Sequence, residues 1–351
     1  MKSKQQNVAQ NADALLAWLG NSMGVRGTLL GVLISLIGFI AHAEVLNTPI
    51  TATPIVSFDL NDADRTRFGK LNFIGGLVLR SSRAKFGGVS GLRILENGTL
   101  IAVTDSGFWF HGQLQRSKQG IPAAISKGQI APLLDGEGRP FGNKWFADAE
   151  GVTIAKEFVL VSTEQDTRVL LYRTGESLLR SKSIEIPVPS LGSRFRSNNG
   201  LEAIATFPKN HKYVGNVLVI RERPGQDEID NQGFILSGQI KGRFSIHIDK
   251  GFAITDADFL PSGDLLILER KFTMGRGAQV RIRRIDGATI MADAKLQGEI
   301  IFEADSNQKI DNMEGISVFK GPFGKTRIGL ISDDNHWPLQ RTLYLEFALE
   351  N

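Results

Sequence analysis

Short apolar runs alternate with turn-forming residues along most of this chain. From Pro54 onward the runs are rich in Val, Ile, Leu and Phe, and they are separated by Gly, Asn, Asp and Pro, as at 96–98 and 261–264. Runs of this length between turn signals are typical of β-strands, and almost none has the 3.6-residue period of an amphipathic helix. The pattern therefore predicts an all-β fold.

One sequence unit recurs five times. Each copy opens a short strand beside a small residue, turns, and returns as a second apolar strand that ends in charged residues. The openings lie at residues 88–95, 148–154, 198–204, 255–260 and 311–319. Their spacing of about 50 to 60 residues is that of one four-stranded propeller blade. We expect a β-propeller of five blades. The alternatives are a sixth blade built from residues 54–86 and a β-sandwich whose acidic turns recur by coincidence.

The two ends of the chain are expected to close this ring together. Strands are predicted before the first unit at 55–60 and 72–79, whereas the last unit has only three candidate strands and ends at 342–347. An N-terminal strand would complete the last sheet. Closure would also protect strand edges that can otherwise template aggregation.

The first 43 residues are expected to be a signal peptide outside the fold. An apolar run at 28–40 follows Arg26, and Ala41-His42-Ala43 has the small residues that signal peptidase accepts. A start at Met23 would give a compact signal peptide, so we treat Met23 as a candidate start. Cleavage after Ala43 predicts a periplasmic or secreted protein with a single domain at 44–351. The apolar run is shorter than the roughly 20 residues that a membrane span needs. Cleavage would also remove it, so no membrane span is expected in the remaining chain; an uncleaved anchor is the alternative.

The composition narrows the chemistry. Hydrophobic residues make up 42% and charged residues 22% of the chain, and the formal net charge is +4. The charge is spread along the chain, and there is no run of basic residues with interleaved aromatic residues, so nucleic acid is not expected as a partner. The chain has no cysteine, which excludes disulfides, thiol catalysis and cysteine-bound metals. A serine-esterase elbow, a His-Glu-x-x-His zinc motif and a phosphate-binding P-loop are also absent from the sequence.

Seven short phrases occur in an order that resembles a known family. They are Gly-Val-Ser-Gly-Leu at 88–92, Thr-Asp-Ser-Gly at 104–107, Asp-Ala-Glu-Gly at 148–151, Asn-Asn-Gly-Leu-Glu at 198–202, Leu-Leu-Ile-Leu-Glu-Arg at 265–270, Asn-Met-Glu-Gly at 312–315 and Ser-Asp-Asp-Asn at 332–335. From roughly residue 70 to the C-terminus, the chain resembles the bacterial phytase-like family, which is described as having esterase-like activity of phytase. The resemblance implies a secreted β-propeller and a phosphoester hydrolase. It supplies no catalytic residues that could be transferred to this chain.

The repeated units would gather carboxylates at one end of a propeller. The innermost strands ring a channel, so the unit openings converge at one mouth, and the ends of the second strands form another acidic set: Asp105, Glu164, Glu222, Glu269 and Asp333 with Asp334. Two carboxylates about 4 Å apart repel by roughly 4 kcal/mol at an effective dielectric constant of 20. Converging acids must therefore share protons, pair with arginine or bind a cation.

Oxygen ligands without cysteine or clustered histidine suit Ca²⁺, or else Mg²⁺. The candidate metal ligands are Asp105, Asp148, Glu202, Asp258 and Asp333. The alternative for each of these acids is a structural role, because Asp or Glu at a strand end often accepts backbone N–H bonds in a turn.

Five further residues are candidates for catalysis or substrate binding. Glu150 and Glu314 are the catalytic carboxylates that we expect at the mouth, and His336 is a candidate general acid or base because it follows three acidic and amide residues. Arg221 and Arg270 lie beside acids at strand ends and could bind an anionic substrate through their planar guanidinium groups. The alternatives are internal salt bridges for the arginines and an exposed loop position for His336.

Three functions remain open at this point. The first is hydrolysis of a phosphoester or related ester, with Ca²⁺ held by channel carboxylates and a small anionic or ester substrate. The second is a metal-dependent lactonase or sugar-ester hydrolase of the propeller type. The third is a periplasmic propeller that binds a ligand without catalysis.

Overall fold

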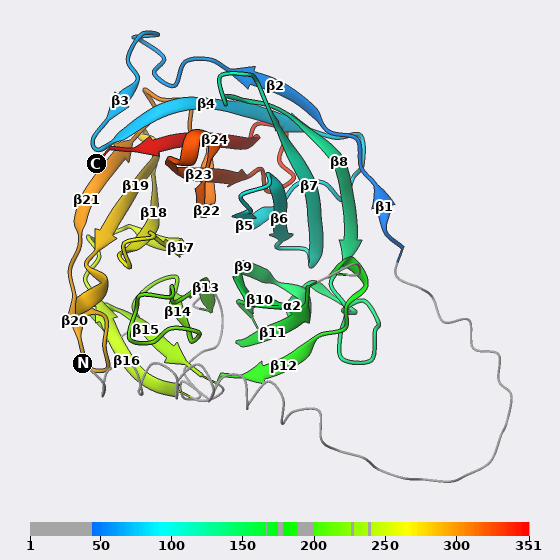
Figure 1. The fold of residues 1–351 in the computed structure, drawn as a ribbon, viewed down its shortest axis with the longest axis vertical. Helices are drawn as coiled ribbons and strands as arrows, with labels where there is room; N and C mark the ends of the chain where they lie inside the picture. Colours follow the sequence, from blue (N-terminus) through cyan, green and yellow to red (C-terminus); the bar gives the residue numbers. More distant parts are fainter. Residues whose placement is uncertain are drawn as a thin grey trace, which may run out of the picture.

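The computed structural model describes residues 44–350 apart from 166, 175–177, 189–199, 226–227 and 238–239. The expected signal peptide, with its Met23 start and cleavage after Ala43, lies outside the described residues. Five sheets stand around a common axis as the blades of a propeller (Figure 1). The expected all-β propeller with five blades is confirmed.

Each blade begins at the axis and adds its next strands outward by antiparallel pairing. Blade 1 contains β5 (Val89–Ile94), β6 (Thr99–Thr104), β7 (Phe108–Arg116) and β8 (Pro122–Pro132), with β1 (Leu46–Asn47) at its outer edge. Blade 2 contains β9 (Ala149–Ala155), β10 (Phe158–Thr163), β11 (Arg168–Arg173) and β12 (Ile184–Pro187). Blade 3 contains β13 (Leu201–Thr206), β14 (Val217–Arg221), β15 (Asn231–Leu236) and β16 (Ile240–Ile246), with β20 (Lys295–Leu296) outside.

The last two blades follow the same plan. Blade 4 contains β17 (Ala253–Phe259), β18 (Leu265–Thr273), β19 (Gly277–Ile285) and β21 (Glu299–Ala304). Blade 5 contains β22 (Asn312–Lys320), β23 (Thr326–Asp333), β24 (Thr342–Leu349), β4 (Leu71–Arg80) and β2 (Thr51–Ile55), and β3 (Arg67–Phe68) pairs with β4. The short helical turns are α2 (Lys144–Ala147), η1 (Leu178–Arg180), η2 (Gly287–Thr289) and η3 (Pro322–Gly324). Among the described residues, no helix has the length and apolar character that crossing a membrane would need.

Strands from both ends of the chain close the ring, as expected. β4 pairs with β24 in antiparallel register, with Leu77 opposite Tyr344, and β2 then pairs with the outer side of β4. The residues proposed for a sixth blade therefore belong to blade 5. The strand predicted at 55–60 was misplaced, because β2 ends where that prediction began.

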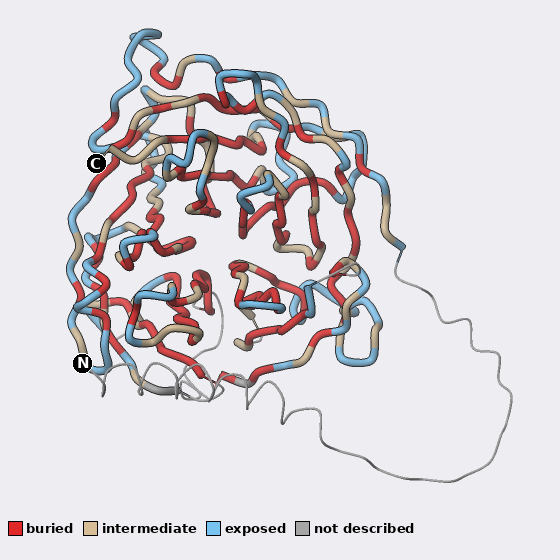
Figure 2. Tube along the Cα trace, in the orientation of Figure 1, coloured by how far each residue is buried: buried red, intermediate tan, exposed pale blue. Residues whose placement is uncertain are grey.

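The hydrophobic core lies between neighbouring blades rather than at the axis. Five clusters of buried apolar side chains each join two adjacent sheets, such as Trp109 of blade 1 with Tyr172 of blade 2, whose rings meet edge to face. Buried residues follow the inner strands, and exposed residues follow the outer loops (Figure 2). This arrangement leaves the channel itself free for polar side chains.

One buried arginine ties the innermost strands together across the axis. Arg93 of β5 is 5% exposed; its Nη1 donates to the Asp256 carboxylate at 3.1 Å and to the Ile316 carbonyl at 2.7 Å. Its Nη2 donates to the carbonyls of Ile204 and Ala257, each at 2.9 Å. These bonds join blade 1 to blades 3, 4 and 5. Burial raises the pKa of Asp256 to about 7 although Arg93 acts in the opposite direction.

We predict that Arg93→Met destabilises the protein by roughly 3–5 kcal/mol, because it leaves Asp256 buried without its cation. The free energy of unfolding from urea titration checks this. Arg139→Met is the control, since Arg139 pairs with Asp135 and Glu137 at the surface with 67% of its side chain exposed. Its loss should cost at most about 1 kcal/mol. Similar losses for the two variants would contradict a structural role for the Arg93 bonds.

Candidate functional site

A shift in strand register occurs at the same place in all five blades. Each innermost strand loses its regular pairing with the second strand near the start of the strand. The residues at these irregular positions are Ser90, Glu150, Glu202, Thr255 and Glu314. A β-bulge adds a residue to one strand and re-aims its side chain. Four of these five side chains line a cavity at one end of the channel.

The ends of the second strands provide another set of equivalent positions. The strand registers align Asp105, Glu164, Glu222, Arg270 and Asp333 from blades 1 to 5. All five line the same cavity, and the connection before β9 adds Lys144 and Asp148. Blade 4 therefore differs from the others, because it supplies Arg270 where its neighbours supply a carboxylate.

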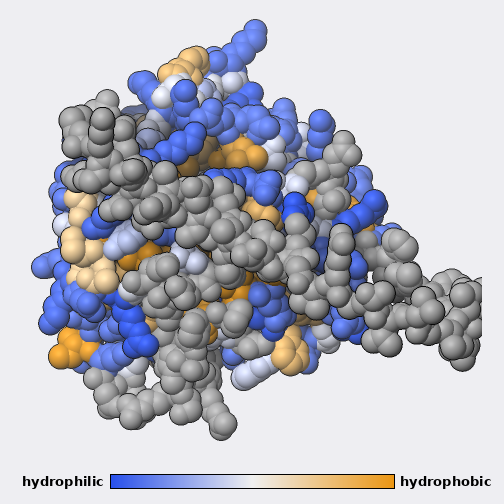
Figure 3. Space-filling model, turned by 60° about the horizontal axis from the view of Figure 1, so that its bottom comes forward, coloured by the Kyte–Doolittle hydropathy of each residue, from blue (hydrophilic) through white to orange (hydrophobic). Residues whose placement is uncertain are grey.

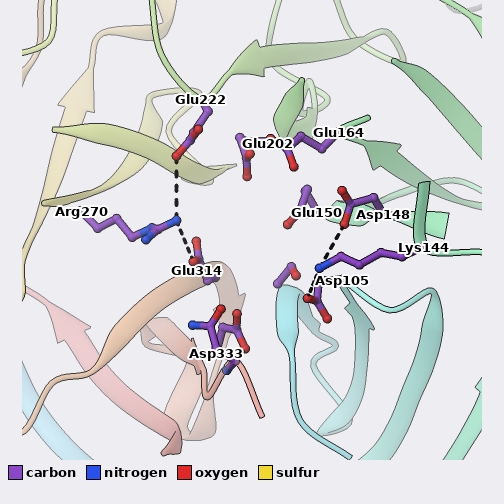
Figure 4. Close-up of a pocket in the computed structure, with 12 residues that line it drawn as sticks. Asp105, Lys144, Asp148, Glu150, Glu164, Glu202, Glu222, Arg270, Glu314 and Asp333 are labelled. Atoms are coloured by element: carbon purple, nitrogen blue, oxygen red, sulfur yellow. Dashed lines mark hydrogen bonds and ion pairs between the residues drawn. The ribbon is translucent and has the colours of Figure 1, made fainter. Parts of the chain in front are cut away.

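The resulting cavity at the channel mouth has a volume of about 200 Å³ and is lined entirely by polar residues (Figure 4). Eight of the lining residues are carboxylic acids, two are cationic, and Ser90 and Asn335 complete the set. The eight acids are Asp105, Asp148, Glu150, Glu164, Glu202, Glu222, Glu314 and Asp333. We call this cavity the acidic mouth.

Burial and mutual repulsion raise the pKa values of several of these acids, which therefore retain protons. Burial first, and neighbouring carboxylates second, raise the pKa of Glu164 to about 7 and hold the pKa values of Glu150 and Glu202 well above their usual range. Burial also raises the pKa of Asp333 to about 7 and that of Glu314 to about 8. At neutral pH the acidic mouth therefore carries fewer negative charges than it would if all eight acids were ionised. A bound cation would replace the protons.

Two overlapping groups of acids have ligand atoms close enough to share a cation. In one, atoms of Asp148, Glu150 and Glu164 lie within 4.8 Å of one another; in the other, the same holds for Glu164, Glu202 and Glu222. Glu164 belongs to both groups. These carboxylate oxygens are the donor type preferred by hard divalent cations.

Two cationic side chains stand on opposite sides of the acidic mouth (Figure 4). Arg270 Nη2 lies 3.0 Å from Glu314 Oε1 and 3.9 Å from Glu222 Oε1. Lys144 Nζ lies 2.6 Å from Asp105 Oδ2 and 3.7 Å from Asp148 Oδ1. Both side chains are therefore held by acids on the wall of the mouth, where they could also bind an incoming anion.

The structure gathers seven of the ten predicted site residues at this mouth. They are Asp105, Asp148, Glu150, Glu202, Arg270, Glu314 and Asp333.

Three predicted residues lie outside the lining of the acidic mouth. Arg221 is buried and pairs with Glu228 at 2.8 Å. It is the last residue of β14, directly before Glu222, so its side chain points to the opposite face. Asp258 lies deeper in the channel, where its carboxylate accepts a hydrogen bond from the Val318 N–H at 2.7 Å. In blade 4 the bulge position is occupied by Thr255, not by Asp258. His336 is exposed on the β23–β24 connection.

Some lining residues were not among the predicted site residues. Glu164 and Glu222 were visible in the sequence as acidic strand ends, and Ser90 lay within a quoted phrase. Lys144 had no signal, because its contact with Asp105 depends on the path of the long connection between β8 and β9. Asn143 starts α2 there by accepting a hydrogen bond from the Phe146 N–H at 3.3 Å.

Comparison with known proteins gives one family. A sequence model of the phytase-like family, described as esterase-like activity of phytase, matches residues 84–336. No curated protein is significantly similar in sequence to the chain.

Several solved structures resemble the chain at low similarity. A PQQ-bound aldose sugar dehydrogenase from Streptomyces coelicolor is 12% identical, with 78% of this chain and 98% of that chain covered and a TM-score of 0.39. Glutaminyl cyclase from Myxococcus xanthus is 14% identical, with coverages of 79% and 97% and a TM-score of 0.41. A protein of unknown function from Dyadobacter fermentans is 12% identical, with coverages of 89% and 100% and a TM-score of 0.41. Similarity at this level supports no argument about function.

The raised carboxyl pKa values predict that the cation-free protein loses stability as the pH rises. Glu314 has an ordinary pKa of 4.5 when unfolded and about 8 when folded. The folded state therefore binds more protons between these values, and stability present below the lower value is lost as the pH rises through the upper one. When a chelator keeps divalent cations away, the melting temperature of the protein should fall by several degrees between about pH 5.5 and about pH 8.

Glu314→Gln should reduce this pH dependence because it removes one of the titrating groups. Glu157→Gln should leave it intact, since Glu157 is exposed in the turn between β9 and β10, at the other end of its blade. A melting temperature that stays constant or rises over this pH range would contradict the assigned pKa shifts.

Proposed function

The chain belongs to the phytase-like family, and on that premise we propose that it hydrolyses a phosphoester or related ester at its acidic mouth with the help of bound Ca²⁺. The observation that carries the proposal is the gathering of eight carboxylic acids in one cavity, with two groups of three that share Glu164. We further propose that residues 1–43 are a signal peptide and that the protein acts in the periplasm or outside the cell.

The donor set fits a hard divalent cation. Asp148, Glu150, Glu164, Glu202 and Glu222 would hold it through carboxylate oxygens. The raised pKa values of Glu150, Glu164 and Glu202 mean that these groups are poorly satisfied without positive charge. When bound, such a cation polarises a phosphoryl oxygen and lowers the pKa of water.

Arg270 and Lys144 would bind the anionic part of the substrate from two sides. The Arg270 guanidinium is planar and can donate two parallel hydrogen bonds to a phosphate, whereas the Lys144 ammonium acts as a compact charge. Both already have carboxylate partners, so substrate binding would share or replace those contacts. Their positions on opposite walls would orient the reacting group over the acids between them.

Glu314 is the proposed general acid. Its Oε1 binds Arg270 and accepts a hydrogen bond from Asn312 Nδ2 at 2.8 Å, which leaves Oε2 to carry a proton. With a pKa of about 8, the group is largely protonated at neutral pH and can protonate the oxygen of a leaving group. Glu150, on the neighbouring wall, would take up a proton or hold the cation.

Calcium should raise the melting temperature of the wild-type protein and have a much smaller effect on Glu164→Gln. Glu164 belongs to both ligand groups, so its loss weakens both. The expected stabilisation is about 2.7 kcal/mol at a calcium concentration 100 times Kd. Thermal unfolding with calcium and with chelator measures it, and Glu157→Gln is the control. If Glu164→Gln responds like the wild type, these groups do not bind the cation.

Glu150→Gln and Glu314→Gln should each lower kcat for phosphoester hydrolysis by at least about 100-fold, as expected for loss of proton transfer. Their free energies of unfolding should change little, because a neutral amide replaces an acid that burial already disfavours as an anion. Steady-state kinetics and urea unfolding on the same samples check both parts. Parallel loss of folding would show that the two residues are structural. If calcium binds but the wild type hydrolyses no phosphoester, ester or lactone, the non-catalytic binding propeller is correct instead.

A further inference from the structure

Two tryptophans are exposed beside the acidic mouth. The described residues contain three tryptophans: Trp109 is 1% exposed in the core, whereas Trp145 is 52% and Trp337 is 59% exposed. Indole rings are large apolar groups that proteins bury or use for binding. Hydrophilic residues cover most of the described surface in Figure 3, and hydrophobic residues appear there as separate patches. Two exposed indoles on the loops of one site therefore require an explanation.

Both tryptophans lie on connections that also supply the acidic mouth. Trp145 follows Lys144 in α2, and Trp337 lies two residues after Asn335 in the β23–β24 connection. The β23–β24 connection meets the β6–β7 turn at Gly88, where a Cβ atom would lie 2.3 Å from Asp105 Oδ1 and 3.2 Å from His336 Nε2. Lys144 reaches the same Asp105 carboxylate. The two indoles are thus attached to neighbouring parts of one rim.

Hydrogen bonds fix the connection that carries Trp337. Asn335 and His336 both have positive φ angles, of 47° and 48°, which is unfavourable for residues with side chains. The Asp334 carboxylate offsets this: Oδ1 accepts from the N–H groups of Gly88 at 3.0 Å and His336 at 3.1 Å, and Oδ2 accepts from Thr342 Oγ1 at 2.9 Å. Trp337 is therefore exposed on a turn of defined shape.

The connection that carries Trp145 is fixed in a similar way. Asn143 caps α2, Lys144 pairs with Asp105, and Arg168 Nη2 donates to the Phe146 carbonyl at 2.9 Å. Aromatic side chains on pre-organised backbone bind with little loss of conformational freedom. Both indoles therefore have the properties of binding platforms.

We propose that Trp145 and Trp337 select substrates whose leaving group carries a flat ring, either aromatic or a sugar ring, which stacks on the indoles while the anionic group enters the acidic mouth. The inference rests on the proposed function of the mouth. The twelve lining residues of the mouth are all polar, so the cavity offers no apolar contact to such a ring. An apolar part of the substrate would be held at the rim, on the connections that carry the two indoles.

A binding experiment tests the stacking without any catalysis. Isothermal titration calorimetry with calcium present would compare phenylphosphonate with methylphosphonate, which share the anionic group and differ in the ring. The wild type should bind phenylphosphonate about 5- to 10-fold more tightly, in line with the strength of aromatic contacts. Trp145→Ala/Trp337→Ala should lose this preference and keep its affinity for methylphosphonate. Phe323→Ala should retain the preference, since Phe323 is 75% exposed but follows β22 at the opposite end of the channel.

Kinetics then test the effect on specificity. The double variant should lose about 5- to 10-fold in kcat/KM for phenyl phosphate, mainly through KM, and less than about twofold for methyl phosphate. A phenylphosphonate that does not bind, equal wild-type affinities for the two phosphonates, or an unchanged preference in the double variant would overturn the inference. Ring-selective binding without hydrolysis would refute the proposed function but would still show that the indoles hold a flat ring beside a bound anion. A glucose phosphate distinguishes sugar rings from aromatic rings as the preferred group.

Discussion

Eight carboxylic acids share one cavity, and they cannot all be ionised there without compensation. This electrostatic constraint explains two other features of the mouth, the raised pKa values and the inward reach of Lys144 and Arg270. Each of these features reduces the net negative charge or supplies a positive partner. A divalent cation would do so most effectively, because it replaces several protons with one ion.

The fold concentrates the acids by repeating one local irregularity. A register shift occurs near the start of each innermost strand and turns one side chain into the mouth in four of the five blades, and the end of each second strand supplies another. Five blades bring these equivalent positions to the same mouth. Blade 4 breaks the acidic pattern with Thr255 and Arg270, so the ring is chemically asymmetric. Deeper in the channel, Arg93 binds the inner strands of other blades and holds the ring on which this geometry depends.

Much of this arrangement could be predicted from the sequence, because each sequence repeat corresponds to one blade. The spacing of the units indicated five blades, and the incomplete last unit indicated closure by an N-terminal strand. The acids Asp148, Glu150, Glu202 and Glu314 could be placed at one mouth because they occupy similar positions in their units. Arg221, Asp258 and Lys144 could not be placed in the same way. A bulge changes which side chain faces the channel, and the reach of Lys144 depends on a long connection without a repeating pattern.

The most direct test of the central claim is the number of protons released when calcium binds at neutral pH. Titration calorimetry in buffers with different ionisation enthalpies measures it. If the cation replaces protons held by the buried acids, about one or more protons should leave for each calcium ion bound. The release should fall as the pH rises above about 7, where Glu164, a member of both ligand groups, loses its own proton. Calcium binding without proton release, or no binding, would contradict the account.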